Sequence, residues 1–240
     1  MVKFKILSTK KLEPSLIVKA REKAVCVEEQ EAITIRPLLS AQQLKELPGL
    51  TESNDVKLIV FTSCNAVEIV SEKMQEAGLQ PRNWKIACIE GKTLETVLKL
   101  FPQVEIIATA TYGKILADKL VTLPLPEVYF FCGNIRRDEL PEMLRKQAAV
   151  FHETVVYETL LNRIKTNEHY DGVLFFSPSA AESYFSVNEL DPGTVCFAIG
   201  ETTAACVRLY TRNNIVISPY PNQEKMTEEV LKYFCLESQA

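Results

Sequence analysis

The chain has 240 residues, of which 47% are hydrophobic and 24% charged, with a formal net charge of −4 at pH 7. The composition is typical of a globular protein, and the length suggests one large domain or two small ones. The net negative charge argues against a general nucleic-acid-binding protein, which would carry an excess of basic residues.

Short apolar runs alternate with amphipathic segments along the first half of the chain. The runs are rich in β-branched and aromatic residues and predict buried strands, while apolar residues at helical spacing predict helices. We predict strands over residues 3–9, 32–38, 57–63, 84–90, 104–108 and 127–133, and helices over residues 14–23, 65–78, 91–101, 111–123 and 136–147. The stretch after residue 38 is expected to form a loop or a short helix.

The same alternation continues to the end of the chain. We predict strands over residues 152–159, 171–177, 195–200 and 215–218, and helices over residues 180–185, 202–210 and 224–236. Strands that alternate with helices indicate βαβ units and parallel sheets. The strands read as continuous apolar runs, as expected where helices cover both faces of a parallel sheet.

Three segments of the chain recur at a nearly fixed distance of roughly 110 residues. LIVFTSCNAVEIV at 58–70 returns as VLFFSPSAAESYF at 173–185, and IACIEGKTLETVL at 86–98 returns as CFAIGETTAACVR at 196–208. EIIATATYGKILADKL at 105–120 returns as IVISPYPNQEKMTEEV at 215–230. The repeat predicts two copies of one α/β unit, with a cleft between them as the expected place of function.

The order of the repeat is cyclic, which fixes the expected domain layout. KFKILST near the N-terminus corresponds to VYFFCG of the other copy, and AITIRPL at 32–38 corresponds to ETVVYET. One doubly wound α/β domain is therefore expected to be discontinuous, formed by residues 1–36 and 163–240. The second, residues 40–155, is inserted into it, with linkers near 33–39 and 155–162. Only two chain crossings, near Pro37 and Thr159, join the domains, which predicts a hinge.

The cysteines and the N-terminus bear on location. None of the seven cysteines belongs to a CxxC pair. Most fall inside predicted strands or helices, which favours reduced thiols in a cytoplasmic protein. The first ten residues contain no apolar core of signal-peptide length, and the longest apolar runs are far too short to span a bilayer. We therefore expect a cytoplasmic protein with no membrane partner.

Small polar residues collect where a predicted strand runs into a helix. Thr62, Ser63 and Asn65 follow one strand of the first series. Ser177 and Ser179 stand at the matching turn of the second series. One interpretation is helix capping, because these residue types satisfy the first free amides of a helix. The other is an anion site, in which the remaining amides and the helix dipole bind a carboxylate or phosphate.

A second pair of turns repeats this pattern. IGETTAA carries Thr202 and Thr203, and IEGKTLE carries Thr93. Glu90 stands where the other copy has Gly200, and its negative charge weakens the anion interpretation on that side. Neither turn has the glycine content of a dinucleotide or P-loop motif.

The segment CGNIRRDEL, residues 132–140, has no equally polar counterpart in the other copy. Asn134 follows Gly133 in an expected tight turn, and Arg136 and Arg137 are expected to open a helix. Cations oppose the dipole at a helix N-terminus. The arginines are therefore either ordinary surface residues or partners for an anionic ligand.

Tyr157 lies in the segment that leads from the inserted domain back to the first. It is either a buried core residue or a phenol that faces the cleft and donates a proton or a hydrogen bond. The two histidines, His152 and His169, form neither a metal-ligand nor a catalytic-triad pattern.

These motifs together resemble the uroporphyrinogen-III synthase family over nearly the whole chain. The resemblance depends on the order and spacing of FTSCNAVE at 61, FFCGNIRRDELPEML at 130, VVYET at 155, FFSPSAAESYF at 175 and FAIGETTAACV at 197. Cys64, at a position often filled by proline, and Glu90 depart from the family pattern. The resemblance implies two flavodoxin-like doubly wound domains, one inserted into the other and joined by a two-stranded linker, which agrees with the cyclic repeat.

The resemblance also implies the reaction. The substrate would be hydroxymethylbilane, a linear tetrapyrrole with eight carboxylates, which is closed with inversion of ring D and loss of water, without cofactor or metal. In the family's mechanism the first ring loses its hydroxyl to give an azafulvene, the last ring attacks to form a spiro intermediate, and this intermediate fragments and recloses. Tyr157 matches the tyrosine proposed as the general acid.

The same matching suggests residues that bind the substrate. They are Thr62, Ser63, Asn65, Thr93, Asn134, Arg136, Arg137, Ser177, Ser179, Thr202 and Thr203. We expect a monomer without a nucleic-acid partner, in transient contact with the preceding enzyme of the pathway. The alternatives are a non-catalytic hinged protein that binds an anionic small molecule, and a flavodoxin-like redox module. The redox module is disfavoured because no Ser/Thr-rich phosphate loop is present.

Overall fold

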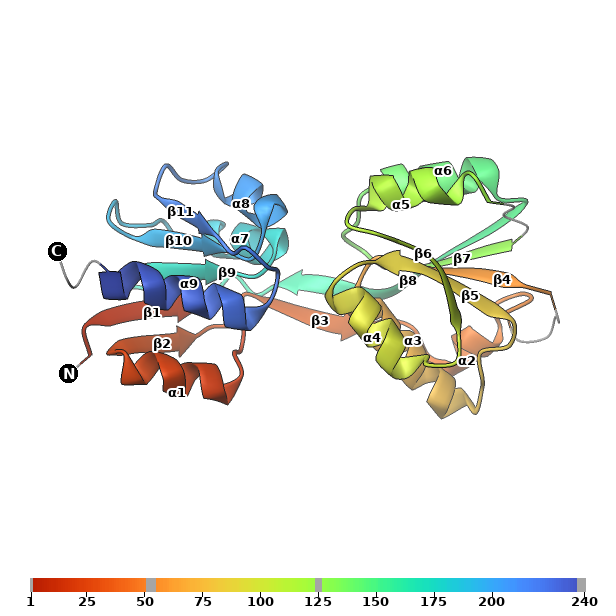
Figure 1. The fold of residues 1–240 in the computed structure, drawn as a ribbon, viewed down its shortest axis with the longest axis horizontal. Helices are drawn as coiled ribbons and strands as arrows, with labels where there is room; N and C mark the ends of the chain where they lie inside the picture. The colour runs from red at the N-terminus through yellow and green to blue at the C-terminus, as the bar shows by residue number, and fades with distance from the viewer. Residues whose placement is uncertain (1, 51–54, 124–126, 237–240) are drawn as a thin grey trace. The chain divides into compact units, whose positions relative to one another are not determined.

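The computed structural model describes residues 2–50, 55–123 and 127–236. The chain divides into two compact units (Figure 1). One unit contains the described residues up to Thr34 and from Leu160 onward, and the other runs from Ile35 to Thr159. We call them the discontinuous unit and the inserted unit. Within the described ranges, no helix combines the length and apolar character needed to cross a membrane.

The discontinuous unit is a five-stranded parallel sheet with the order β11-β10-β9-β1-β2. Its strands are β1 (Phe4–Ser8), β2 (Val25–Glu29), β9 (Gly172–Phe175), β10 (Val195–Ala198) and β11 (Ile215–Ile217). Its helices are α1 (Pro14–Glu22), α7 (Pro178–Phe185), α8 (Glu201–Val207) and α9 (Gln223–Leu236). Helices α1 and α9 pack on one face, and α7 and α8 on the other (Figure 1).

Both faces of this sheet are buried, which explains the continuous apolar runs. In β9, Leu174 joins the core under α1 and α9, whereas Val173 and Phe175 join the core under α7 and α8. Because side chains alternate between the faces of a strand, every residue of such a strand must be apolar. The strand GVLF is accordingly buried at all four positions.

The inserted unit contains a six-stranded sheet with the order β3-β8-β7-β4-β5-β6. Its strands are β3 (Ile33–Pro37), β4 (Lys57–Phe61), β5 (Trp84–Ile89), β6 (Glu105–Ala110), β7 (Glu127–Gly133) and β8 (Val150–Leu161). Its helices are α2 (Ala41–Lys45), α3 (Cys64–Ala77), α4 (Lys92–Leu100), α5 (Gly113–Leu120) and α6 (Glu139–Gln147). Helices α2, α3 and α4 cover one face, and α5 and α6 cover the other (Figure 1).

The chain passes between the units along β3 and β8, which are neighbours in the sheet. The Leu38 amide donates to the Val156 carbonyl over 2.9 Å, and the Asn162 amide donates to the Ala32 carbonyl over 2.9 Å. The partners therefore advance in opposite directions along the two strands, as in an antiparallel ladder. Every other pairing described in this sheet is parallel.

The strand orders confirm the cyclic repeat. Strands β6-β5-β4-β7-β8 of the inserted unit match β11-β10-β9-β1-β2 of the discontinuous unit. The counterpart of β7 is therefore β1, as predicted for KFKILST. The counterpart of β8 is β2, residues Val25–Glu29, and the prediction that residues 32–38 fill that place is wrong.

The missed strand has a local cause. Strand β2 follows α1 after only Lys23 and Ala24, and Ala24 adopts the left-handed conformation (φ 60°) that glycine usually marks in a sequence. The strand itself, VCVEE, is a sheet edge with two carboxylates, so its apolar signal is weak. Residues 33–37 are a strand as predicted, but they belong to the sheet of the inserted unit.

Helix capping follows the sequence where polar residues were expected. Ser63 caps α3 by accepting from the Asn65 amide over 3.2 Å, and Ser177 caps α7 by accepting from the Ala180 amide over 3.1 Å. Gly78 ends α3 in the left-handed conformation at φ 68°, as the sequence predicted. These caps fix the ends of the helices that begin at the carboxyl edge of each sheet.

Candidate active site

Four predicted residues of the inserted unit meet at the carboxyl edge of its sheet. The Tyr157 hydroxyl, on β8, donates to Ser63 Oγ, at the end of β4, over 2.9 Å. The Asn65 side chain lies near enough to the Tyr157 phenol to lower its pKa. Asn134, directly after β7, donates its backbone amide to the Tyr157 carbonyl over 3.0 Å. Carboxyl ends of parallel strands are where ligands bind in such sheets.

The Asn134 side chain reinforces this arrangement. Its Oδ1 accepts from the Thr159 amide over 2.8 Å, so one residue holds the backbone of β8 on both sides of Glu158. The sequence placed Asn134 in a turn and among the ligand-binding residues. The structure shows that its polar atoms also hold the strand that carries Tyr157.

Tyr157 is buried, with 7% of its surface exposed, and it belongs to the core cluster that contains Phe61 and Phe131. Burial raises the pKa of its phenol, and the hydrogen bond with Ser63 and the nearby Asn65 side chain oppose that rise. The net direction is upward, so the phenol keeps its proton at neutral pH. The structure places Tyr157 in the core, where its hydroxyl donates a hydrogen bond to Ser63, and its role as a proton donor in the reaction stays a prediction.

Thr62 and Thr93 lie near this edge in different settings. Thr62 is half-buried between β4 and the Ser63 cap. Thr93 lies in the first turn of α4 and is 7% exposed. Glu90, at the same edge, is exposed and accepts a hydrogen bond from the Thr109 hydroxyl over 3.4 Å. A carboxylate therefore stands beside the α4 turn, as the sequence indicated.

The two arginines differ from the prediction. They do not open a helix, because α6 begins at Glu139 with Asp138 as its N-cap residue. The residues that begin α6 are acidic and therefore complement the helix dipole. Arg136 forms ion pairs with Asp138 and Glu153. Arg137 is exposed, and no carboxylate among the described residues lies within ion-pair distance of it.

The remaining predicted residues lie in the discontinuous unit, at the carboxyl edge of its own sheet. Ser177 and Ser179 are half-buried at the start of α7. Thr202 is exposed and Thr203 is 3% exposed in the first turn of α8, which follows Gly200. Like the turns at Ser63 and Thr93, each of these turns connects a strand to the helix that follows it.

Neither histidine contributes to these edges. His152 stacks on Tyr129 with ring centroids 4.5 Å apart, and its Nε2 lies 3.1 Å from Glu127 Oε1, near the start of β7 and β8. This is the end of the strands opposite to Tyr157. His169 is exposed and pairs with Asp191 over 2.6 Å.

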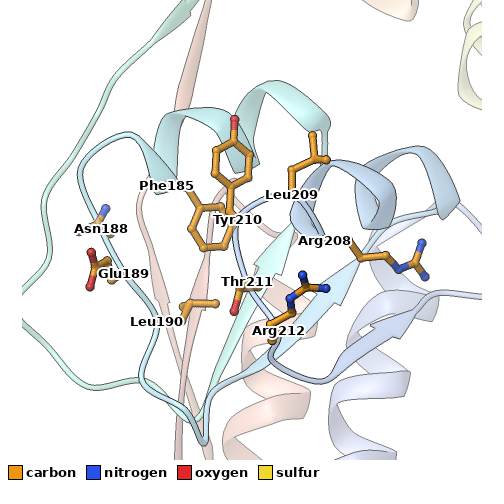
Figure 2. A pocket seen from close by; sticks show the side chains of 9 residues that line it. All are labelled: Phe185, Asn188, Glu189, Leu190, Arg208, Leu209, Tyr210, Thr211 and Arg212. Carbon is orange, nitrogen blue, oxygen red and sulfur yellow. The ribbon is translucent and has the colours of Figure 1, made fainter.

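A cavity of about 480 Å³ lies elsewhere, at the carboxyl ends of helices α7 and α8 (Figure 2). Phe185 and Tyr210 stack there with ring centroids 5.0 Å apart. Its polar lining includes Arg208, which pairs with Glu201 over 2.7 Å, and Arg212. Ser177 and Thr203 lie at the opposite ends of the same helices, so this cavity is separate from the predicted site.

The chain is similar to known proteins in both sequence and structure. The family model described as uroporphyrinogen-III synthase HemD matches residues 16–228. A uroporphyrinogen-III synthetase structure from Helicobacter pylori is 18% identical, with a TM-score of 0.63, over 96% of this chain and 100% of that one. A mutant uroporphyrinogen III synthase from the extremely thermophilic bacterium Thermus thermophilus is 12% identical, with a TM-score of 0.72, over 99% of this chain and 100% of that one. At these identities the structural likeness shows the fold, and no curated protein matches the sequence.

Proposed function

The chain belongs to the uroporphyrinogen-III synthase family, and on that premise we propose that it performs the family reaction with Tyr157 at the centre of the active site. The observation that carries the function is the family match over residues 16–228. The enzyme is a lyase of tetrapyrrole and haem biosynthesis. It closes hydroxymethylbilane to uroporphyrinogen III, with inversion of ring D and loss of water.

The geometry at Tyr157 suits a general acid. The hydroxyl of the first ring must be protonated as it leaves, and a positioned acid typically accelerates such a step by about 10²–10⁴-fold. Burial holds the pKa of the Tyr157 phenol above its ordinary value, so the proton is present throughout the neutral range. Ser63 Oγ, at 2.9 Å, accepts that proton's hydrogen bond. A leaving hydroxyl that took the place of Ser63 as acceptor would receive the proton directly.

The strand-to-helix turns suit the carboxylates of the substrate. Each capping serine occupies one free amide, the Asn65 amide for Ser63 and the Ala180 amide for Ser177. The other amides of the first helical turn have no intrahelical partner and point toward the helix N-terminus. Together with the helix dipole they favour an anion by about 0.3–1 kcal/mol per contact.

We propose these turns and their neighbours as the substrate-binding set. Its members in the inserted unit are Thr62, Ser63, Asn65, Thr93, Asn134 and Arg137, and those in the discontinuous unit are Ser177, Ser179, Thr202 and Thr203. Asp138 and Glu153 already form ion pairs with Arg136, so Arg136 attracts a further carboxylate less strongly. Arg137 is the arginine better placed to meet a carboxylate.

Catalysis on this view depends on conformational control more than on a strong nucleophile. The uncatalysed closure gives the wrong isomer, so the enzyme must hold the chain of four rings in the conformation that leads to the spiro intermediate. Holding reacting atoms in place can supply several kcal/mol of the barrier. Amides, hydroxyls and one retained proton are sufficient chemistry for that task.

The test is the isomer ratio of the product. Hydroxymethylbilane, generated in the assay, is supplied to the purified protein, and the oxidised uroporphyrin isomers are separated. The function predicts isomer III in excess over the isomer I that forms spontaneously. An isomer ratio equal to that of the protein-free control would reject the function.

We also propose that the enzyme acts as a cytoplasmic monomer that meets the preceding enzyme of the pathway only transiently. The six cysteines whose side chains are described are all free thiols, as in proteins of a reducing compartment. Size-exclusion chromatography with light scattering tests the monomer. A stable dimer at micromolar concentration would reject it.

A further inference from the structure

Strand β8 contains an irregularity directly before Tyr157. Residues 127–132 of β7 pair in step with 150–155 of β8, but the next pair is Gly133 with Tyr157. Val156 is therefore one extra residue in β8, the arrangement of a β-bulge. Bulges of this kind change the direction in which the following side chain points.

Burial along β8 shows the effect. Val155 is 40% exposed, whereas Val156 and Tyr157 are exposed by only 0% and 7%. A regular strand would place two consecutive side chains on opposite faces. Here Val156 and Tyr157 both enter the core cluster under α3. The extra residue thus sends Tyr157 to the face where Ser63 begins that helix.

The residue paired with Tyr157 across the strands is a glycine, and the phenol ring lies directly against it. A Cβ atom at Gly133 would lie 2.5 Å from Cζ, 2.6 Å from Cε2 and 2.7 Å from the hydroxyl oxygen of Tyr157. These are the nearest atoms that such a Cβ would meet. The backbone of Gly133 is not in the left-handed region, so the need for glycine here comes from space and not from conformation.

The backbone around the bulge is held by hydrogen bonds on both sides. The Val156 carbonyl accepts from the Leu38 amide over 2.9 Å and from the Leu39 amide over 3.2 Å. The Tyr157 carbonyl accepts from the Asn134 amide over 3.0 Å. Because this backbone is fixed, the Tyr157 ring can make room for a Cβ atom at residue 133 mainly by moving its hydroxyl away from Ser63.

We infer that Gly133 is a positioning residue, and that with the bulge at Val156 it sets the place of the Tyr157 hydroxyl against Ser63 Oγ. The catalytic part of this inference rests on the proposed role of Tyr157 as the general acid. The contact itself does not depend on that role. A methyl group at Gly133 must push the ring by about 1 Å to reach ordinary van der Waals distance, and a misplacement of that size can cost about 100-fold in rate.

The first test measures the position of the phenol without using activity. Tyrosine is labelled with ¹³C at Cζ, and the Tyr157 signal among the eight tyrosines is assigned by its loss in Tyr157→Phe. Gly133→Ala is expected to shift this signal, because the added methyl group displaces the ring and its hydroxyl from Ser63 Oγ. An unchanged signal in a folded Gly133→Ala protein would overturn the inference.

Gly113→Ala is the matched control in the same unit. A Cβ at Gly113 would meet only Leu140 Cβ, at 3.8 Å, which is ordinary contact. This variant is expected to leave the Tyr157 signal and the activity unchanged. If it shifted the signal as much as Gly133→Ala does, the contact at Gly133 would not be the cause.

The second test uses the reaction. In Gly133→Ala, kcat is expected to fall by about 10- to 100-fold while KM changes by less than about threefold, because only the proton transfer is disturbed. In the Tyr157→Phe background the same substitution is expected to have no further effect on kcat. An equal loss in both backgrounds would indicate a merely structural effect and would overturn the positioning role.

Two further outcomes are informative. If the wild-type protein gives no excess of isomer III, the proposed function fails. The NMR signal of Tyr157 still tests whether Gly133 positions the Tyr157 ring. If Gly133→Ala does not fold, the size exchange Gly133→Ala/Tyr157→Val is measured, since removal of the ring frees the space. Recovery of a cooperative unfolding transition supports the contact, and failure to recover it contradicts the contact.

Discussion

Replacing Ser63 by alanine tests the hydrogen bond at the centre of the site. Ser63 Oγ has two functions in the structure, because it accepts from the Asn65 amide at the start of α3 and from the Tyr157 hydroxyl. Loss of an N-cap costs about 1 kcal/mol of unfolding free energy. A buried hydroxyl that loses its acceptor costs about 1–3 kcal/mol more. Ser63→Ala is therefore expected to destabilise the inserted unit by about 2–4 kcal/mol.

The assay has a natural probe in this unit. Trp84 is the single tryptophan, is 5% exposed, and belongs to the same core cluster as Tyr157. Its fluorescence during urea unfolding reports the unit that contains Ser63. Ser40→Ala is the matched control, because Ser40 caps α2 of the same unit by accepting from the Gln43 amide over 3.1 Å. It should cost only about 1 kcal/mol.

A double-mutant cycle isolates the pair. In the Tyr157→Phe background the hydroxyl is absent, so Ser63→Ala should cost only the cap, about 1 kcal/mol. The difference between the two backgrounds is the coupling of Ser63 and Tyr157, expected at about 1 kcal/mol or more. Equal costs in both backgrounds, within about 0.5 kcal/mol, would refute the hydrogen bond.

Four other substitutions have distinct expected outcomes. Tyr157→Phe should lower the rate of isomer III formation by about 100-fold or more with the unfolding transition of Trp84 retained, and wild-type activity would remove the phenol from the mechanism. Arg137→Ala should raise KM with kcat nearly unchanged in steady-state kinetics. Arg136→Ala should instead lower the free energy of urea unfolding by about 1 kcal/mol or less, because its partners Asp138 and Glu153 stay partly solvated. A KM effect from Arg136→Ala and a stability effect from Arg137→Ala would contradict the geometry. Burial raises the pKa of Cys196 to about 12, so the unfolded thiol ionises first as pH rises and stability is lost above about pH 8.5. Between pH 7 and pH 10 this ionisation should lower the free energy of unfolding by about 2 kcal/mol, and Cys196→Ala should abolish that part of the loss. If the free energy of unfolding of the variant fell with pH as steeply as that of the wild type, the burial of the thiol would be contradicted.

The sequence predicted the repeating elements because their signals are local. The apolar runs, the serines at Ser63 and Ser177 and the glycine at Gly78 each specify structure within a few residues, and the structure places strands, caps and a helix end there. The cyclic order of the repeat then determined which strands correspond. It failed at β2, where a short acidic edge strand follows a turn without glycine.

The assembly of the site was beyond local signals. Ser63 and Tyr157 are 94 positions apart, and their contact depends on the order of β4, β7 and β8 in the sheet. Nothing in the sequence VVYET indicates the bulge at Val156. The role of Gly133 becomes visible only in the structure, where the Tyr157 ring lies against it. The helix expected at Arg136 likewise begins later, at Glu139, where acidic residues complement its dipole.

The proposed reaction is the closure of hydroxymethylbilane, with inversion, at the site around Tyr157. The most direct measurement is the uroporphyrin isomer ratio produced from hydroxymethylbilane by the wild-type protein and by Tyr157→Phe in parallel. Isomer III should dominate with the wild type, and the spontaneous isomer I should dominate with the variant. Isomer I in both reactions, at the ratio of the protein-free control, would contradict the function, and isomer III in both would contradict the site.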